Sequence, residues 1–531
     1  MLKILFLKPL LQRSPQITLA LGFGVLMGVT PAHPVLWGIA WFALGPLWFF
    51  GLQSPPLWRA ALLGFCWGVG YHGTALSWIW GLHPMTWMGI PWAASLAIAI
   101  AAWAFVTVWG AFIPTLWLVT LAALSRHRVP PLLRIWMATS LWCLLEWLWT
   151  QSPLWWTSLS YTQSPHNLAI LHLGQFSGPG LVSAVLVLVN GCWAEAWIAW
   201  SRSRRGLDRM GLTQTPWVRG AMAVLILSHG LGALMLAQPL NPSAENALNI
   251  GIVQGNIPTR IKLFPAGLSQ AFRDYQQGYE QLVSQGAEAV LLPEGAFPTT
   301  WNPRSPRFQS FLATVHRQGI PAWVGTFMPQ GDYITQSLVT VTPENFQFSH
   351  YAKVKLVPLG EYLPWEETLG QLIGRLTPLS YRMLPGADDQ QLNTPFGKAI
   401  VAICYDSAFP QLFRDQVAKG GEFILSVANN DPYSHRMMLQ HHAQDVMRAI
   451  ESDRWLVRAT NTGYSSVINP HGKTLWRSQR NTYQTHLATL YRRQGQTLYT
   501  RWNNWFLPVQ GLTSGLGWWK WHRERRPKDT G

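Results

Sequence analysis

The sequence predicts a bundle of membrane-spanning helices followed by a layered α/β domain. Charged residues make up only 12% of the 531 residues, about half the usual share in soluble proteins. They are unevenly spread, because residues 1–240 hold almost no acidic side chains whereas residues 248–492 have the composition of a soluble domain. Most of the 32 tryptophans lie in the first half or near the C-terminus. Since tryptophan collects at bilayer interfaces, these observations together predict a membrane domain over residues 1–240.

Apolar runs of bilayer-spanning length define the expected helices of this domain. The run at 91–124 is too long for one upright span, so it is tilted, extends out of the bilayer or breaks near Pro114. A cleaved signal peptide is the alternative for the first run, but six further runs follow and no small-residue cleavage site is evident. The seven runs are 16–29, 34–51, 58–80, 91–124, 134–149, 177–200 and 217–238.

Basic residues occur in every second gap between these runs, beginning with the segment before the first. This alternation predicts a cytoplasmic N-terminus, about seven spans, and everything after residue 240 outside the cytoplasm. The net charge of +16 therefore reflects membrane loops better than nucleic-acid binding. Residues 502–521 form an aromatic stretch that we interpret as a C-terminal transmembrane helix, with an interfacial or re-entrant segment as the alternative. The basic residues that set the pattern are Lys3, Lys8, Arg13, Arg59, Arg126, Arg128, Arg134, Arg202, Arg204, Arg205, Arg209 and Arg219.

Residues 248–492 alternate short β-rich runs with polar helical stretches, which predicts an α/β domain built on a sheet core. The polar stretch 241–246, which contains Pro242, is interpreted as the linker. Strands are expected at 248–253, 289–292, 322–326, 336–341, 399–404, 423–427, 456–460 and 465–468. Helices are expected at 268–284, 305–318, 410–419 and 436–452.

Three residues that can take part in nucleophilic catalysis lie at or near the ends of three separate short apolar segments: Glu294, Lys353 and Cys404. Taken singly, each has an ordinary structural explanation, because a cysteine at a strand end is usually a small buried hydrophobe. A glutamate directly after a buried run is costly to desolvate unless it has a partner. A lysine beside a cysteine lowers the thiol pKa, and it can also stabilise an oxyanion together with a backbone N–H after the nucleophile. The combination therefore predicts acyl-transfer or amide-cleaving chemistry at a membrane.

Three motifs resemble the nitrilase (carbon–nitrogen hydrolase) superfamily, and in particular its integral membrane branch, the apolipoprotein N-acyltransferases. The most specific is Tyr351-x-Lys353-x-x-Leu356-Val-Pro-x-Gly-Glu361-Tyr, which resembles the lysine signature of that branch. Val253-Gln254-Gly255-Asn256-Ile257-Pro258 resembles the start of its catalytic domain, and Arg458-Ala-Thr-Asn461-Thr-Gly463 resembles a late strand and turn. The resemblance covers nearly the whole chain. It implies an αββα sandwich over residues 248–492, with several spans before it and one after it.

The resemblance also implies roles for individual residues. Glu294 would be the general base, Lys353 the oxyanion donor and Cys404 the acylated nucleophile, while Glu361 would order the triad and Tyr405 would supply a backbone N–H to the oxyanion. The implied reaction moves a fatty acyl chain from a membrane phospholipid, through a thioester, to the α-amino group of an S-diacylglyceryl-cysteine lipoprotein. The implied location is the bacterial cytoplasmic (inner) membrane, with the catalytic domain on the extracytoplasmic side. No cofactor, metal or nucleic acid is expected, because the sequence has no P-loop or zinc-ligand spacing.

The chain departs from the family pattern next to the expected site. The family usually has Cys-Tyr-Glu, whereas here Asp406 follows Tyr405 and carries a carboxylate that is one methylene shorter. The loop after the next strand, Asn430-Asp431-Pro432-Tyr433, has an aromatic but not the usual tryptophan. Leu263-Phe264-Pro265 and Pro364-Trp365 are candidate lids at the membrane face, with ordinary packing as the alternative.

Two acidic residues lie inside the apolar runs. Glu146 is costly in lipid, so we expect it to face the helix bundle and to pair between helices rather than to bind substrate. Glu195 lies closer to the interface. Three cysteines inside apolar runs do not form a disulfide framework.

Two other functions remain open from the sequence. A membrane-anchored amidase or nitrilase would use water as its second substrate, and a transporter or lipid-binding protein would have lost catalysis. The second is less consistent with the chain because all three triad residue types are present. A monomer is the default expectation.

Overall fold

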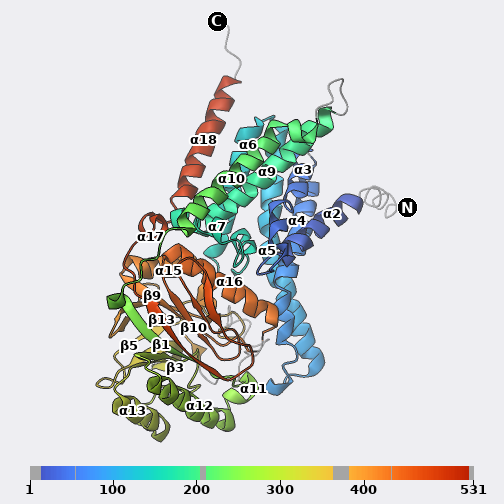
Figure 1. Cartoon of the computed structure of the whole chain (residues 1–531). Helices are drawn as coiled ribbons and strands as arrows, with labels where there is room; N and C mark the ends of the chain where they lie inside the picture. The colour runs from blue at the N-terminus through green and yellow to red at the C-terminus, as the bar shows by residue number, and fades with distance from the viewer. Residues whose placement is uncertain (1–13, 54, 204–210, 363–381, 432, 526–531) are drawn as a thin grey trace.

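The computed structural model describes residues 14–53, 55–203, 211–362, 382–431 and 433–525. A helical region and an α/β region lie one above the other, and the C-terminal helix returns to the helical region (Figure 1). The predicted combination of an apolar helical region with an α/β sandwich is therefore confirmed. Two features singled out in the sequence, Pro364-Trp365 as a candidate lid and Pro432 in the departing loop, lie outside the described residues.

The helical region contains the elements expected from the apolar runs. By length and composition, three of the described helices could cross a membrane: α5, α9 and α10. The other predicted spans form helices of 16 to 20 residues, or shorter pieces. The long helices are α2 (Ser14–Val29), α4 (Leu57–Ala75), α5 (Trp92–Arg126), α6 (Pro131–Thr150), α9 (Pro179–Ser203) and α10 (Pro216–Leu236), and the short ones are α3 (Gly45–Leu52), α7 (Leu168–Leu171) and α8 (Gly174–Ser177).

The apolar run at 34–51 is not one continuous helix, which corrects the simplest interpretation of that run. It forms a 3-10 helix, Leu36–Trp41, then a turn, then α3. The side chain of Asn190 on α9 caps the start of α3, because its Oδ1 accepts hydrogen bonds from the N–H groups of Leu44 (3.0 Å) and Gly45 (2.9 Å). A buried polar side chain from a distant helix thus satisfies the free N–H groups at the start of α3.

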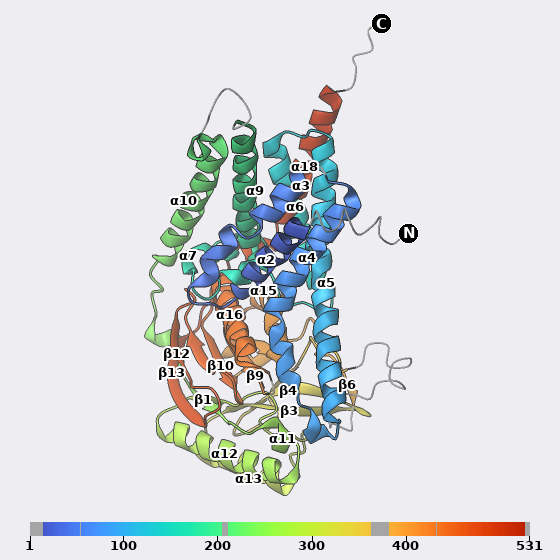
Figure 2. The same ribbon diagram turned by 90° about the vertical axis from the view of Figure 1, so that its right-hand side faces the viewer.

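The run at 91–124 forms one 35-residue helix, α5, that continues through Pro114. A helix of this length is about 52 Å long, well beyond the ~30 Å apolar thickness of a bilayer. Its lower end reaches the level of the sheets of the α/β region (Figure 2). Of the alternatives open from the sequence, a break at the proline is therefore wrong, and extension beyond the neighbouring helices is what the structure has.

Helices α2 and α4 pack with their backbones in direct contact. A Cβ atom added to Gly24 of α2 would lie only 2.1 Å from the carbonyl oxygen of Trp67 on α4. Small residues at such crossings are typical of helix pairs in membranes, where close van der Waals packing takes the place of the hydrophobic effect.

The two acidic residues of the apolar runs bind neighbouring helices, as expected. Glu146 is buried, and its Oε1 accepts a hydrogen bond from the backbone N–H of Leu159 (2.8 Å). Its Oε2 accepts hydrogen bonds from the hydroxyls of Ser158 (3.0 Å) and of Ser183 on α9 (2.7 Å). Glu195 pairs with an arginine of α6, and both residues therefore have structural partners.

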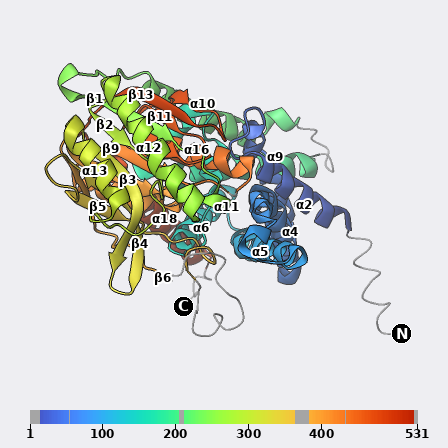
Figure 3. The same cartoon turned by 90° about the horizontal axis from the view of Figure 1, so that it is seen from below.

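The α/β region is a sandwich of two sheets. The first has the strand order β13-β1-β2-β3-β4-β5, with β6 also paired to β4, and the second has the order β12-β11-β10-β9-β8-β7. Helices α12 (Pro265–Ser284) and α13 (Pro306–Gln318) lie side by side over the first sheet (Figure 3). Helix α15 (Pro410–Ala418) packs on β8 and β9 of the second sheet, and α16 (His435–Ser452) packs beside α15 and contacts Ser426 of β9 and Arg458 of β10 through Asp445. The predicted αββα layering is confirmed. The strands are β1 (Ala247–Gln254), β2 (Ala289–Leu291), β3 (Ala322–Gln330), β4 (Tyr333–Val341), β5 (Ser349–Ala352), β6 (Arg382–Met383), β7 (Leu392–Thr394), β8 (Gly397–Ile403), β9 (Gly421–Ala428), β10 (Leu456–Thr460), β11 (Ser466–Ile468), β12 (Thr474–Arg477) and β13 (Gln484–Tyr491).

Every strand and helix expected in this region is present, but several short or polar strands were not predicted. The most important are β5, which carries the lysine motif, and β13, which pairs antiparallel with β1 along its whole length. β5 is short and mixes polar with apolar residues, and β13 is partly exposed. The hydrophobic periodicity that would predict a strand is therefore weak in both.

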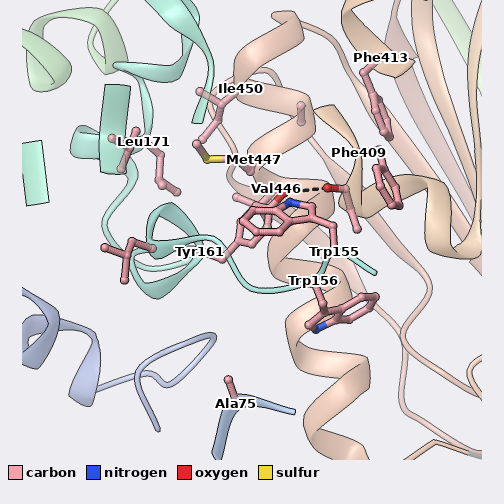
Figure 4. Close-up of a cluster of buried hydrophobic side chains, with 14 of the residues drawn as sticks. Ala75, Trp155, Trp156, Tyr161, Leu171, Phe409, Phe413, Val446, Met447 and Ile450 are labelled. Carbon is pink, nitrogen blue, oxygen red and sulfur yellow. Dashed lines mark hydrogen bonds between the residues drawn. The ribbon is translucent and has the colours of Figure 1, made fainter. Parts of the chain in front are cut away.

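The helical and α/β regions share one hydrophobic core. Trp155, Trp156 and Tyr161, from the segment after α6, pack against α16 and the start of α15 (Figure 4). The indole N–H of Trp156 donates a 2.7 Å hydrogen bond to Gln440 of α16. This contact holds the α/β region against the helices.

The C-terminal helix α18 (Phe506–Glu524), preceded by α17 (Leu498–Trp502), covers most of the stretch predicted as a last span. It lies beside α6, where the hydroxyls of Ser514 and Ser140 are 2.9 Å apart. The indole N–H of Trp136 donates a 2.8 Å hydrogen bond to Thr513. The chain therefore ends by packing again on the helical region.

Candidate active site

The three residues singled out in the sequence come from both layers of the sandwich. Glu294 follows β2 and Lys353 follows β5, both in the first sheet, whereas Cys404 follows β8 in the second. Both Glu294 and Lys353 act electrostatically on the thiol of Cys404. The structure thus brings the three predicted residues together at one end of the sandwich, between its sheets.

Lys353 is the centre of the arrangement. Its ammonium group lies 3.0 Å from Oε1 of Glu294 and 2.6 Å from Oε1 of Glu361, and its side chain is fully buried. Burial disfavours the charge, but the two carboxylates outweigh burial and raise the pKa of Lys353 well above its usual value. Lys353 therefore carries a fixed positive charge, as an oxyanion donor requires.

Glu294 is held from two sides. Its second carboxylate oxygen accepts a 2.7 Å hydrogen bond from the backbone N–H of Asn429, and its own carbonyl accepts one of 3.2 Å from Lys262. The turn that carries it lies directly on β3, because a Cβ atom on Gly325 would lie 2.1 Å from the carbonyl oxygen of Pro293. Burial lowers the pKa of Lys262 to about 8. Glu294 is thus fixed by contacts from several segments far apart in the sequence.

Glu361 lies beside Lys353. One carboxylate oxygen binds Lys353, and the other accepts a 2.8 Å hydrogen bond from the backbone N–H of Val357. Burial raises the pKa of Glu361, and the pull of Lys353 opposes that rise. Glu361 therefore holds the ammonium group of Lys353 in place.

Cys404 stands in a left-handed conformation, with φ at +52°. This region costs a residue with a side chain about 1–2 kcal/mol, and such strain is common where a nucleophile is presented at a sharp turn. Burial, followed by Glu294, raises the pKa of the Cys404 thiol, although Lys353 lowers it. Lys353 thus acts on the thiol in the expected direction, but burial and Glu294 outweigh it, so a base is needed to remove the thiol proton during attack.

Asp406 connects the end of β8 with the segment that follows β5. It is fully buried, and its carboxylate accepts hydrogen bonds from the backbone N–H groups of Lys355 (2.7 Å) and Ile403 (3.1 Å). Burial raises the pKa of Asp406 to about 7, and these backbone bonds limit the rise. The shorter carboxylate found at this position therefore has a defined structural contact.

The side chain of Tyr405 points to the helical region. Its hydroxyl donates to the carbonyl of Pro153 (2.9 Å) and accepts from the N–H of Trp155 (2.9 Å), and its ring stacks on Trp156. The role of its backbone N–H remains a prediction. The side chain itself ties the residue after the nucleophile to the helices.

Several residues at the site were not assigned a role from the sequence. His441 of α16 contacts the carbonyl of Cys404, Arg458 contacts His441, and Asn429 binds Glu294. Arg458 lies within the motif that resembled a late strand of the family, so a signal for it existed. His441 lies in a polar helical stretch that cannot be told from a solvated face by composition.

The loops at the rim differ in how they pack. Tyr433, the aromatic residue of the departing loop, makes an edge contact with Trp78 of the helical region, with ring centroids 5.3 Å apart. Of the candidate lid residues, Leu263 packs on a small cluster around Leu356, whereas Phe264 is 44% exposed. Among the described residues, no group of three or more His, Cys, Asp or Glu side chains is placed to hold a metal ion.

Comparisons with known proteins cover both regions. A carbon-nitrogen hydrolase family model matches residues 249–498, and a model of the apolipoprotein N-acyltransferase N-terminal domain matches residues 23–192. A protein named apolipoprotein N-acyltransferase from a Nostoc species is 50% identical, over 93% of this chain and 97% of that protein. Proteins of the same name from a Synechocystis species and from Thermosynechococcus vestitus are each 43% identical, over 93% and 92% of this chain and 98% and 92% of theirs. Among solved structures, the NitFhit protein of C. elegans is 17% identical, over 50% of this chain and 64% of that chain, with a TM-score of 0.38.

Proposed function

We propose, from the premise that the chain belongs to the apolipoprotein N-acyltransferase family, that it moves a fatty acyl chain from a membrane phospholipid to the α-amino group of S-diacylglyceryl-cysteine lipoproteins. The observation that carries the assignment of the site is the buried Lys353, held between Glu294 and Glu361 and acting electrostatically on Cys404. This is the arrangement that a cysteine acyl transfer needs, with a base, a fixed cation and a nucleophile in one place.

The first half-reaction forms a thioester. Glu294 takes the proton of the Cys404 thiol as sulfur attacks an ester carbonyl of the phospholipid. Lys353 and the backbone N–H of Tyr405 hold the negative charge on the carbonyl oxygen. The ester C–O bond then breaks, the leaving alkoxide receives the proton from Glu294, and lysophospholipid departs. Because the resting thiol is neutral, removal of its proton and attack by sulfur belong to the same step.

The second half-reaction uses the same groups in reverse. The α-amino group of the lipoprotein attacks the thioester carbonyl, Lys353 again stabilises the oxyanion, and Glu294 accepts a proton from the amine. The C–S bond breaks, and the thiolate of Cys404 is protonated again. The net change is one ester bond lost and one amide bond formed, with no cofactor consumed.

The helical region explains how such substrates would reach the site. Withdrawing acyl chains from a bilayer costs about 0.8 kcal/mol per CH₂, so the site must lie close to the membrane surface. We assign residues 1–240 to a membrane domain with about seven spans, residues 248–492 to an extracytoplasmic catalytic domain and residues 502–521 to a last span. The alternation of basic residues supports this orientation, and the shared core and the packing of α18 on α6 support one compact unit. A monomer in the bacterial cytoplasmic membrane completes the proposal.

Intact-protein mass spectrometry of the detergent-purified protein after incubation with phospholipid tests the first half-reaction. We expect a fatty-acyl mass increment on the wild type that hydroxylamine removes, and none on Cys404→Ala. Cys66→Ala is the matched control, because it removes another free cysteine, in the helical region, and should leave the increment in place.

A diacylglyceryl peptide with a free N-terminus then tests the second half-reaction. It should discharge the thioester and gain the acyl chain, whereas the same peptide with an acetylated N-terminus should not. If the wild type takes up no acyl chain but hydrolyses small amides, the amidase alternative replaces this proposal.

A further inference from the structure

A buried histidine lies against the backbone of Cys404, the expected nucleophile. Nε2 of His441, on α16, is 2.9 Å from the carbonyl oxygen of Cys404. The side chain is completely buried. Neither half-reaction described above uses this contact.

The partners of His441 determine which of its nitrogens carries the proton. Nδ1 lies 2.7 Å from Nη2 of Arg458 and 3.0 Å from Nδ2 of Asn430. Arginine has only donors, so Nδ1 must be an acceptor. Burial and the charge of Arg458 lower the pKa of His441 well below its usual value of 6.5, so the ring is neutral. The proton is therefore on Nε2, which donates to the carbonyl of Cys404.

Arg458 is itself held rigidly. Its Nη1 lies 2.6 Å from Oδ2 of Asp445, which also accepts a 2.8 Å hydrogen bond from Ser426. His441 and Asp445 are four residues apart on α16 and so lie on the same face of the helix, towards β10 with its Arg458. All four side chains are buried. Because an unpaired polar group is costly in such an interior, the whole chain of contacts resists displacement.

The carbonyl that receives this hydrogen bond is part of the expected oxyanion site. Cys404 C=O and Tyr405 N–H belong to one planar trans peptide, in which the two groups point in opposite directions. Fixing the carbonyl towards α16 therefore fixes the N–H away from α16. Tyr405 is anchored independently through its hydroxyl on Pro153 and Trp155.

We propose that His441, held by Arg458 and Asp445, is a positioning residue that locks the Cys404–Tyr405 peptide so that the Tyr405 N–H faces the substrate oxyanion. The proposal rests on the proposed function for the identity of the reaction, but its geometry applies to any ester that acylates Cys404. Without the histidine, the peptide could rotate away from the strained left-handed turn, and one oxyanion donor would be lost.

The matched variants are His441→Leu, His441→Gln and His442→Leu. Leucine fills the site without a donor, whereas glutamine can place an N–H near the position of Nε2. His442 is the next residue on α16 and is also buried, but its Nε2 contacts Thr474 of β12 rather than the nucleophile. His442→Leu therefore reports the general effect of removing a buried imidazole from this helix.

Acylation by p-nitrophenyl butyrate is the first readout. Sulfur attacks the ester, the thiol proton passes to Glu294, and the released p-nitrophenolate gives a burst whose rate is measured. We expect His441→Leu to slow the burst about 10²-fold, the usual effect of losing one oxyanion donor. His441→Gln should recover most of the rate, and His442→Leu should react like the wild type.

Alkylation of Cys404 by iodoacetamide is the second readout, because this displacement at a saturated carbon forms no oxyanion. We expect His441→Leu to be alkylated at the wild-type rate. Equal losses in both reactions would mean that the histidine only maintains the fold, and a burst no slower than that of His442→Leu would also overturn the proposal. Acylation of the wild type by the activated ester but not by phospholipid would instead refute the proposed donor and leave the comparison of variants valid.

Discussion

Replacing Asp406 by asparagine tests how burial controls the charge of the carboxylate that joins the two catalytic strand ends. In the folded protein this carboxyl has a pKa of about 7, against 3.8 for the ordinary group, because it is fully buried. Its carboxylate oxygens accept hydrogen bonds from the backbone N–H groups of Lys355 and Ile403, which limit the rise of the pKa. Asparagine keeps the size of the side chain and removes its ionisation.

The sign and size of the effect follow from these two pKa values. The folded state binds the proton of Asp406 more tightly than the unfolded state, so the stabilisation is complete below pH 3.8 and is lost as the pH rises to about 7. At about 1.4 kcal/mol per pKa unit, this group lowers the free energy of unfolding by about 2–3 kcal/mol between pH 5 and pH 8. For a catalytic domain of this size, that is a decrease of about 5 °C in melting temperature.

Intrinsic tryptophan fluorescence during thermal unfolding in detergent, at steps from pH 5 to pH 8, measures this dependence. We expect the melting temperature of the wild type to fall with pH more steeply than that of Asp406→Asn, by about 5 °C over the range. Asp388→Asn, which removes an exposed carboxyl, is the control and should follow the wild type. Equal slopes for the wild type and Asp406→Asn would refute the reasoning, because they would mean that the carboxyl does not titrate in this interval.

Three further changes test the contacts around the nucleophile. Glu361→Gln keeps an acceptor for Lys353 but removes a charge, so acyl transfer should fall about 10-fold or more in a steady-state assay while the protein still folds. Tyr405→Phe removes the hydrogen bonds with Pro153 and Trp155, and should reduce the free energy of unfolding by about 1–3 kcal/mol in a denaturant titration without slowing thioester formation. Lys353→Met should reduce thioester formation by at least about 10³-fold in single-turnover measurements, because it removes the fixed cation and leaves two carboxylates unpaired.

Much of the architecture could be predicted because it depends on local patterns. Apolar runs of sufficient length predicted the helical region, and short apolar strands between polar helices predicted the sandwich. Local patterns predicted the apolar run at 34–51 but not its division into a 3-10 helix and α3. Asn190, more than a hundred residues away, caps the start of α3, and no local pattern contains that information.

For the candidate site, too, the sequence predicted some residues and missed others. Glu294 and Cys404 could be selected because each follows a predicted apolar strand, and Lys353 and Glu361 because both lie in the lysine motif. Their supporting contacts could not be selected, because Asn429 binds through a backbone N–H and His441 lies in a polar helix of ordinary composition. The charge state of Cys404 was also beyond the sequence, since it depends on burial and on two carboxylates brought from other strands.

The order of residues along the chain sets which segments are apolar and which chemical groups stand near their ends. The packing of the folded chain places Glu294 and Lys353 after strands of one sheet and Cys404 after a strand of the other, with Asp406 in contact with backbone from both. The two differ because they depend on interactions over different distances along the chain. Hydrophobic periodicity acts between neighbours along the chain, whereas the pairing of buried polar groups is settled by packing between segments that are distant in sequence.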